Sequence, residues 1–157
     1  LYKHPQIKAL VALPHGEGFG LPIFEATYSG LPVIATGWSG QLDFLVDEEG
    51  KDHFYNVAFD LQQVQDEVVW EGVLIKESMW AYPREQSAKE KMRQCYEDTI
   101  TANENSYALK SHEYAQEVHK NFSAEKMNKK FVDVLLEFVP SSEEWMGELE
   151  SIIQEYE

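Results

Sequence analysis

Cationic side chains are scarce in this sequence, which holds 13 Lys and Arg against 28 Asp and Glu in 157 residues and has a formal net charge of −15. A chain this acidic repels phosphate backbones, so we expect no nucleic-acid partner. The sequence also lacks a basic amphipathic stripe suited to an anionic membrane. No apolar run approaches the roughly 20 residues that a membrane-spanning helix needs, so we expect no membrane span.

Cysteine is almost absent as well, because Cys95 is the only one. An intramolecular disulfide is therefore excluded, which favours a reducing compartment, and we expect a cytoplasmic protein. Cys95 lies on an apolar helical stripe and is expected to be a small buried hydrophobe. The chain starts with Leu1 rather than Met, and we expect it to be a piece of a longer protein.

Apolar runs alternate with glycine-rich turns through the first third of the chain. An order of strand, helix, strand, helix and strand implies right-handed crossovers and a parallel sheet. We therefore expect an α/β fold, a Rossmann-like parallel sheet flanked by helices and followed by C-terminal helices. The predicted strands are 7–13, 31–36 and 54–59, and the predicted helices are 22–29, in which Pro22 is favoured near the start and Gly30 ends the helix, and 40–47.

Residues 60–83 are harder to place and resemble an insertion. Val68–Val69 and Val73–Ile75 are predicted to be short strands, and Trp70 and Trp80 to be core residues. Apolar spacing then predicts helices for most of the remaining chain, of which one is capped by Ser123 and ended by Pro140. We expect residues 1–139 to form one domain and residues 140–157 an acidic amphipathic helix.

The most informative segment runs from His15 to Glu25, between a predicted strand and a predicted helix. Ligands of open α/β sheets bind at the carboxyl ends of the strands, where this segment lies. Gly16, Gly18 and Gly20 allow the backbone to approach a ligand closely. The following helix directs its unpaired N–H groups and the positive end of its dipole to the same place. The segment therefore predicts an anion site.

The charges near this segment indicate which anion it binds. The sequence from Ala9 to Gly50 contains no Lys or Arg but six acidic residues, so backbone amides must hold the anion. Glu17 and Glu25 are poor phosphate ligands, but a carboxylate accepts hydrogen bonds from neighbouring sugar hydroxyls. A phosphate that carries a sugar on each side, as in a nucleotide sugar, fits both features.

Here the sequence resembles a known enzyme family. Glu17 and Glu25 are separated by seven residues in EGFGLPIFEA, which resembles the E-x7-E motif of retaining glycosyltransferases with the GT-B fold, family four. The resemblance continues through GLPVIAT (30–36) and the loop 37–40. Trp80-Ala-Tyr-Pro83 and Asn121-Phe-Ser123 are similar to later segments of that family, so the resemblance covers roughly residues 1–139.

The resemblance implies the C-terminal, donor-binding half of such an enzyme. Glu25 would hold the ribose of the nucleotide, and Glu17 would be the catalytic-site acid that faces the donor sugar. The amides around Gly18, Phe19, Gly20 and Leu21 would contact the sugar or its phosphates. Enzymes of this fold are usually metal-independent, so no metal or other cofactor is expected. The partners would be a nucleotide sugar and an N-terminal acceptor-binding domain of the same protein.

Other residues beside the turn are also candidates. His15 and Gly16 border it, with His15 able to donate to a phosphate or a sugar hydroxyl, and Gly37, Ser39 and Gly40 are expected to line the donor pocket. The remaining histidines show no metal-ligand spacing, so no metal site is expected. We expect activity of the full-length enzyme and none of this chain alone.

Three alternatives remain open. Glu17 could be a solvated loop acid and Glu25 a first-turn acid that complements the helix dipole. The chain could be a non-catalytic module that binds sugar nucleotides or another protein. A nucleotide-sugar epimerase is less favoured, because the E-x7-E spacing followed by GLPVIAT argues against it.

Overall fold

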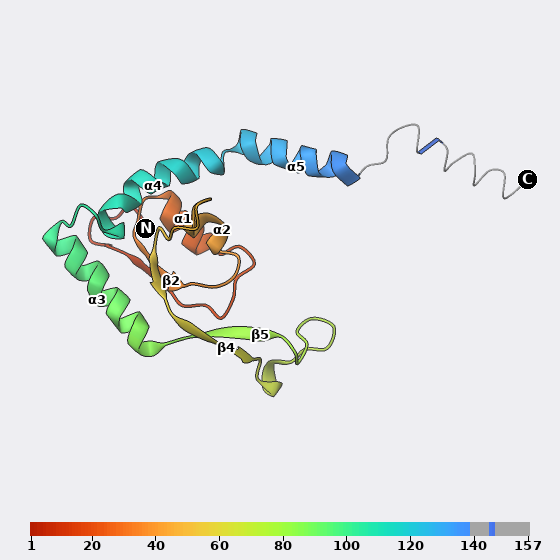
Figure 1. The fold of residues 1–157 in the computed structure, drawn as a ribbon, viewed down its shortest axis with the longest axis horizontal. Coiled ribbons are helices and arrows are strands. Elements are labelled where there is room, and N and C mark those ends of the chain that lie inside the picture. Colours follow the sequence, from red (N-terminus) through yellow and green to blue (C-terminus); the bar gives the residue numbers. More distant parts are fainter. Residues whose placement is uncertain (139–144, 147–157) are drawn as a thin grey trace, which may run out of the picture. The chain divides into compact units, whose positions relative to one another are not determined.

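A three-stranded parallel sheet organises the N-terminal part of the chain in the computed structural model, which describes residues 1–138 and 145–146 (Figure 1). The chain divides into two compact units, Leu1–Val118 and a second unit that begins at His119. The first unit contains the sheet and all the candidate site residues. The predicted boundary after residue 139 adjoins residues outside the description and stays a prediction.

The sheet confirms the expected α/β architecture with parallel strands. Its order is β1 (Leu10–Ala12), β2 (Val33–Thr36) and β3 (Tyr55–Val57), with Ile34 paired to both Val11 and Tyr55. All four residues of β2 are buried, as a continuous apolar run predicts for a central parallel strand. The strands are shorter than predicted, and Val11 on the edge strand β1 is 45% exposed.

The first two helices lie where the sequence predicts them, and α1 has the predicted residues at its start and end. Helix α1 (Leu21–Tyr28) has its proline in the first turn, and Gly30 adopts a φ of 76° just after the helix. The Leu31 N–H donates to the Ala26 carbonyl across this turn, which satisfies one of the last carbonyls of the helix. Helix α2 (Leu42–Leu45) is shorter than the predicted helix 40–47.

Helices cover both faces of the sheet (Figure 1). Helix α3 (Glu85–Thr101) packs on β2 and β3, where Ala88 and Cys95 join a buried cluster with Ile34. Neighbouring strand residues face opposite sides, so Val33 and Ala35 point to the face that α1 covers. The prediction that Cys95 is buried is confirmed, because only 3% of it is exposed.

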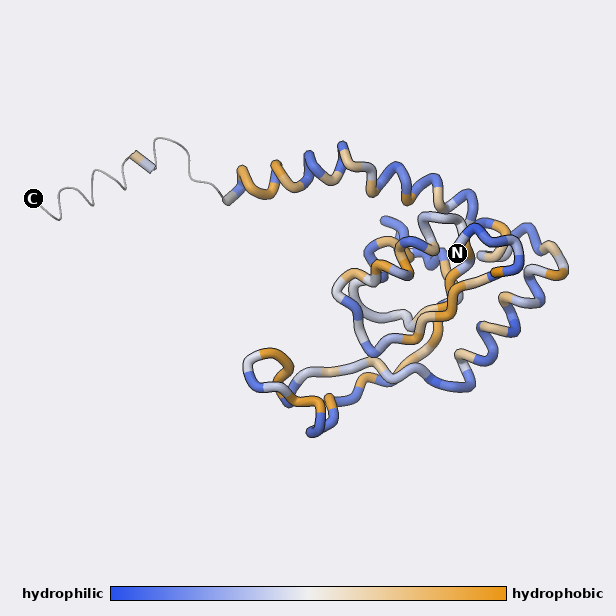
Figure 2. Tube along the Cα trace, turned by 180° about the vertical axis from the view of Figure 1, so that it is seen from behind, coloured by the Kyte–Doolittle hydropathy of each residue, from blue (hydrophilic) through white to orange (hydrophobic). Residues whose placement is uncertain are grey.

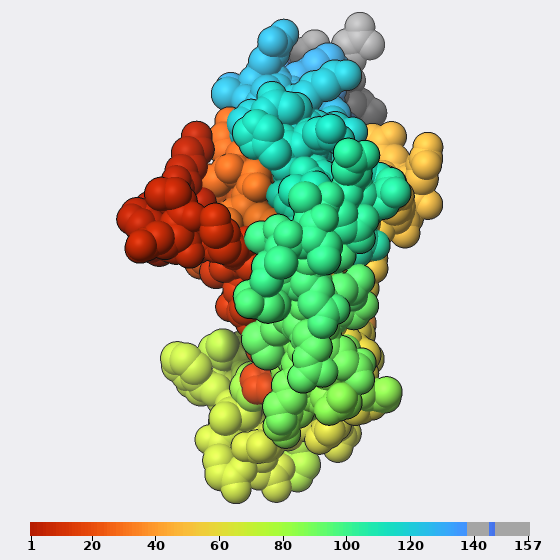
Figure 3. Space-filling view, turned by 90° about the vertical axis from the view of Figure 1, so that its left-hand side faces the viewer, coloured from red at the N-terminus to blue at the C-terminus, as the bar shows by residue number. Residues whose placement is uncertain are grey.

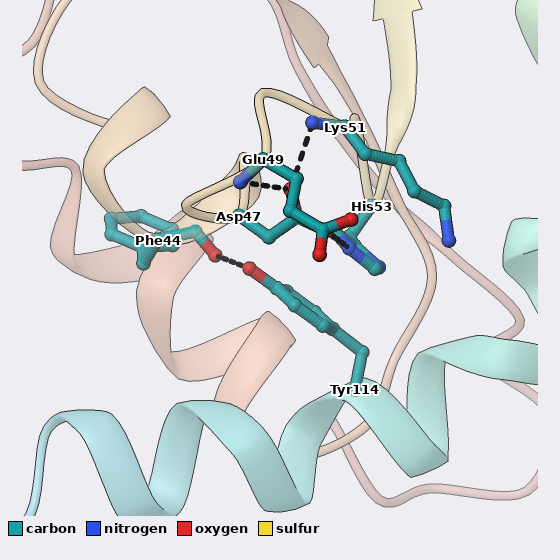
Figure 4. Close-up of polar contacts among 6 residues, drawn as sticks. All are labelled: Phe44, Asp47, Glu49, Lys51, His53 and Tyr114. Atoms are coloured by element: carbon teal, nitrogen blue, oxygen red, sulfur yellow. Dashed lines mark hydrogen bonds and ion pairs between the residues drawn. The ribbon is translucent and has the colours of Figure 1, made fainter.

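Helix α4 (Tyr107–Asn121) is fastened to the loop after α2 by an aromatic stack (Figure 4). The rings of His53 and Tyr114 lie parallel, 3.7 Å apart at their centroids. Nε2 of His53 lies 2.7 Å from an Asp47 carboxylate oxygen, and the Tyr114 hydroxyl donates to the Phe44 carbonyl at 3.1 Å. These contacts hold the segment between α2 and β3 against α4.

The prediction of short strands at Val68–Val69 and Val73–Ile75 was wrong. An antiparallel hairpin forms from β4 (Phe59–Gln63) and β5 (Met79–Pro83). The two valine-rich segments predicted as short strands lie instead at the hairpin tip, which holds a 3-10 turn (Asp66–Val68) and a turn at Gly72 with a φ of 79°. Figure 2 shows hydrophobic residues in this tip. Trp70 is 69% exposed there, so its predicted core position is also wrong, whereas Trp80 is partly buried.

The second unit contains α5 (Ala124–Phe138), whose predicted cap is confirmed. The Lys126 N–H donates to the Ser123 hydroxyl at 3.3 Å. The predicted helix 140–157 lies outside the described residues apart from Trp145 and Met146, which are helical and exposed. None of the helices in the described part of the chain has the length and apolar character needed to cross a membrane.

Candidate functional site

Two loops meet at the carboxyl edge of the sheet because they follow neighbouring strands. The first, residues 13–20, joins β1 to α1, and the second, residues 37–41, joins β2 to α2. Parallel strands direct their carboxyl ends to the same edge, where the ligand sites of α/β proteins form. The candidate residues from His15 to Leu21 and from Gly37 to Gly40 therefore lie in adjacent loops.

Ser39 fastens the second loop to the first. Its hydroxyl donates to the Glu17 carbonyl at 2.8 Å and accepts from the Glu17 N–H at 3.2 Å. The Gly40 N–H donates to the same Glu17 carbonyl at 3.0 Å. Ser39 has a φ of 79°, a left-handed conformation that costs a non-glycine residue of order 1 kcal/mol or more. The surrounding bonds hold it there, so the backbone of the Glu17 loop is fixed before any ligand binds.

The glycines of the two loops have different roles. A side chain on Gly37 would overlap the Asn56 carboxamide, which would have to move, whereas one on Gly40 would overlap the Gly18 carbonyl, so packing against the backbone requires glycine at position 40. Gly20 adopts a φ of 85° directly before α1. Gly18 instead faces open space, because a methyl group added there would have no neighbour within 4 Å, and Gly16 lies loosely against Ser39. Gly18 is therefore the point at which a ligand can approach the backbone.

The helix that follows the first loop begins without a side-chain cap. Gly20 occupies the cap position of α1, and the first bonded amide is that of Phe24, which donates to the Gly20 carbonyl at 2.9 Å. The start of α1 therefore presents backbone N–H groups and the positive end of the helix dipole beside Gly18. Leu21, the first helical residue, is 64% exposed.

The Phe19 side chain holds the first loop against helices α1 and α2. Its ring lies 5.2 Å from that of Phe24 in α1 and 5.0 Å from that of Phe44 in α2. At these separations the Phe19 ring packs against both other rings and lies between the two helices. A ligand would therefore meet the backbone at this position and not the ring.

The two candidate carboxylates lie in different surroundings. Glu17 is half-buried in the first loop, which Ser39 holds, whereas Glu25 is exposed on α1. Glu25 borders an open cavity of about 270 Å³ that is also lined by Tyr2, Phe24, Tyr28 and Ser29. Partial burial, followed by a hydrogen bond to Glu25, raises the pKa of the Tyr2 hydroxyl. The two acids therefore have different polar neighbours, which are Ser39 for Glu17 and Tyr2 for Glu25.

His15 lies against the hairpin, in a relationship that the sequence interpretation missed. Its Nδ1 is 2.8 Å from the Ala81 carbonyl oxygen, and its own carbonyl accepts the Ala81 N–H at 2.9 Å. The ring is stacked on Trp80 and tilted against Tyr82. The aromatic residues at 80 and 82 alternate with the period of a strand, which is the sequence signal from which β5 could have been predicted.

Acidic residues dominate the charge around the site. The segment Ala9–Gly50, which includes both loops, has six acidic residues and no Lys or Arg. Within residues 1–138 and 145–146, no group of three or more His, Cys, Asp or Glu side chains is arranged to hold a metal ion. Backbone amides are therefore the anion-binding groups that these two loops offer.

No protein-family model, curated protein or solved structure matches this chain. The function is accordingly inferred from the chemistry of the two loops and their neighbours.

Proposed function

We propose that the two loops form the donor site of a retaining glycosyltransferase with the GT-B fold. The substrate would be a nucleotide-diphosphate sugar, and the whole protein would transfer its sugar to an acceptor with retention of configuration. The observation that carries this proposal is the pair of hydrogen bonds between the Ser39 hydroxyl and the Glu17 backbone, which hold that backbone beside the exposed Gly18.

The chemistry of the loops supports this substrate. The start of α1 and the amide groups near Gly18 would bind the diphosphate, because oriented N–H groups and a helix dipole stabilise negative charge. Glu17 would accept hydrogen bonds from hydroxyls of the donor sugar, and Glu25 from the ribose hydroxyls. The backbone of the Glu17 loop is held by Ser39 before binding, so little backbone order would be lost there when the nucleotide sugar binds.

Amide NMR titration of the chain tests the proposal directly. UDP, GDP and ADP, and the glucose conjugate of each, would be added separately to ¹⁵N-labelled protein. We expect shifts confined to Gly16–Glu25 and Gly37–Gly40, with one base preferred. Shifts spread over the surface, or none at millimolar ligand, would contradict a donor site.

Two variants separate the expected roles of the acids. Glu25→Ala should weaken binding of the nucleoside diphosphate and its sugar conjugate alike, because both contain the ribose. Glu17→Ala should weaken binding of the conjugate more than binding of the diphosphate. Each change removes charge-assisted hydrogen bonds, which corresponds to a loss of about tenfold or more in affinity. Negligible effects of both changes would argue against the proposal.

A binding module without transferase activity is the second candidate. It is favoured by the lack of Lys and Arg from Ala9 to Gly50, since a cation would stabilise the departing diphosphate. Product analysis on the full-length protein distinguishes the two candidates, because this chain alone is expected to be inactive. Release of the nucleoside diphosphate from the bound conjugate, in the presence of acceptor sugars, indicates transfer, whereas tight binding without turnover indicates a module.

A further inference from the structure

The β4–β5 hairpin meets the first glycine loop through a pair of hydrogen bonds at one residue. The Ala81 N–H donates to the His15 carbonyl at 2.9 Å, and Nδ1 of His15 lies 2.8 Å from the Ala81 carbonyl oxygen. Ala81 is fully buried in the middle of β5. Both the backbone and the ring of His15 are therefore bonded to the same buried residue of β5.

Aromatic rings on β5 fix the orientation of the His15 ring. The Trp80 ring is stacked on it, with centroids 5.2 Å apart and planes 2° from parallel, and the Tyr82 ring is tilted 49° at 4.5 Å. A ring flipped about its Cβ–Cγ bond would lose the bond to Ala81. Contacts with two rings and a buried carbonyl thus select one orientation.

The bond to Ala81 also decides where the proton of a neutral His15 lies. A carbonyl oxygen only accepts hydrogen bonds, so Nδ1 must be the N–H. Nε2 then has a lone pair and accepts a hydrogen bond. The favoured partner of Nε2 is a hydroxyl group, which has a proton to donate, whereas an ionised phosphate oxygen has none.

The hairpin is fastened to the second loop as well. The rings of Phe59 in β4 and Trp38 lie 5.6 Å apart. Arg84 and Asp60 form an ion pair at the hairpin base, where the Arg84 Nε donates to a carboxylate oxygen of Asp60 at 2.9 Å. In Figure 3, atoms of the first part of the chain (red-orange) are visible between α3 (green) and the hairpin (yellow-green). The hairpin base therefore supports both loops.

We propose that strand β5 of the hairpin is part of the sugar-binding site, in which Ala81 sets His15 to accept a hydrogen bond at Nε2 from a hydroxyl of the bound sugar. This inference rests on the proposed function and refines it. His15 selects for the sugar of the conjugate and not for its diphosphate. Ala81, Trp80 and Tyr82 are positioning residues that act through His15.

The tautomer can be measured without any ligand. Long-range ¹H–¹⁵N NMR spectra of the labelled chain distinguish protonated from unprotonated ring nitrogens, and His15→Gln identifies the His15 signals. We expect a protonated Nδ1 and an unprotonated Nε2 in the neutral ring. Trp80→Ala should release the ring and change this pattern, and Trp80→Phe should retain it. A protonated Nε2 in the unmodified chain overturns the inference, whatever the chain binds.

The ligand preference is tested with UDP, GDP, ADP and their glucose conjugates. We expect the His15 Nε2 signal to move with the preferred conjugate more than with its diphosphate, while the His53 signals stay in place because Asp47 and Tyr114 hold that ring. His15→Asn keeps a side-chain N–H near the Nδ1 position but has no group at Nε2. This variant should weaken binding of the conjugate about tenfold more than binding of the diphosphate.

A matched control and the contrary outcomes complete the test. Trp70→Ala changes an aromatic residue of the same hairpin that is 69% exposed at its tip, and should leave both affinities unchanged. If a conjugate binds but His15 does not respond, or if His15→Asn weakens both ligands equally, this inference fails and the proposed function stands. If no nucleotide or conjugate binds, both fail.

Discussion

Gly40 lies so close to Gly18 that a Cβ atom added to Gly40 would come within 2.0 Å of the Gly18 carbonyl oxygen. The two glycines belong to different loops, so the loops touch through their backbones at this point. The Gly40 N–H also donates to the neighbouring Glu17 carbonyl. The shape of the candidate site therefore depends on the absence of a side chain at Gly40, in addition to the side chains that are present.

Gly40→Ala should separate the two loops. The added methyl group overlaps backbone atoms, which cannot rotate away, so we expect a loss of about 1–3 kcal/mol in the free energy of unfolding and loss of the proposed nucleotide-sugar binding. Gly18→Ala is the matched control, because nothing lies within 4 Å of its added methyl group. It should keep the stability and weaken binding alone. Equal urea midpoints for the two variants would contradict this packing.

Ser39 permits a test in which strain and hydrogen bonding are separated. Ser39→Ala removes the hydroxyl bonds to Glu17 but leaves a side chain at a φ of 79°. Ser39→Gly removes the same bonds and also relieves about 1 kcal/mol of left-handed strain. We expect Ser39→Ala to be the less stable variant in urea unfolding, and both to weaken binding. A more stable alanine variant would show that the conformation of Ser39 is not strained.

The sequence predicted those features that depend on neighbouring residues. The parallel direction of the strands follows from the alternation of strands and helices along the chain, and the end of α1 follows from Gly30, whose left-handed conformation suits glycine. The cap at Ser123 is equally local. For the end of α1 and the cap, a segment of a few residues contains the physical cause of the structure.

The missed features depend on residues far apart in the chain. The β4–β5 hairpin pairs Phe59 with Pro83, so neither strand is stabilised by its own sequence alone. The valines at the tip predict strands because β-branched residues favour them, but the turn at Gly72 prevails in the structure. The conformation of Ser39 is also hidden from the sequence, because its cause is the Glu17 backbone in another loop.

Tyr55 joins the sheet to two helices and should be sensitive to loss of its hydroxyl. The hydroxyl donates to Asp98 at 2.8 Å and accepts the Ala108 N–H at 3.2 Å. Burial, with a smaller effect from Asp98, raises the pKa of Tyr55 well above its usual value. Tyr55→Phe removes both bonds, leaves the Ala108 N–H without this acceptor and should cost about 1–3 kcal/mol in urea unfolding. Tyr96→Phe, at a residue 67% exposed, should change stability by less than about 0.5 kcal/mol. A similar loss in both would refute this role.

Asp47 should make the fold sensitive to acid. One carboxylate oxygen of Asp47 accepts the Glu49 and Lys51 N–H groups at 3.0 and 2.9 Å, and the other is bonded to His53 (Figure 4). The bond to His53, followed by the bond from Lys51, lowers the pKa of Asp47 below its usual 3.8. A carboxyl with a lowered pKa in the folded state stabilises the fold at pH values above 3.8. This stabilisation is lost as the pH falls below 3.8 and through the folded-state pKa.

Asp47→Asn should therefore unfold at a higher pH than the unmodified chain during acid titration followed by circular dichroism. The stability difference between the two proteins should be largest near neutral pH and should shrink as the pH falls below 3.8, because Asp47 becomes protonated. Asp133→Asn removes an acid paired with Lys129 on the exposed surface of α5, where ion pairs contribute little, and should leave the midpoint unchanged. An equal shift in both variants would assign the acid sensitivity to net charge and not to the bonds of Asp47.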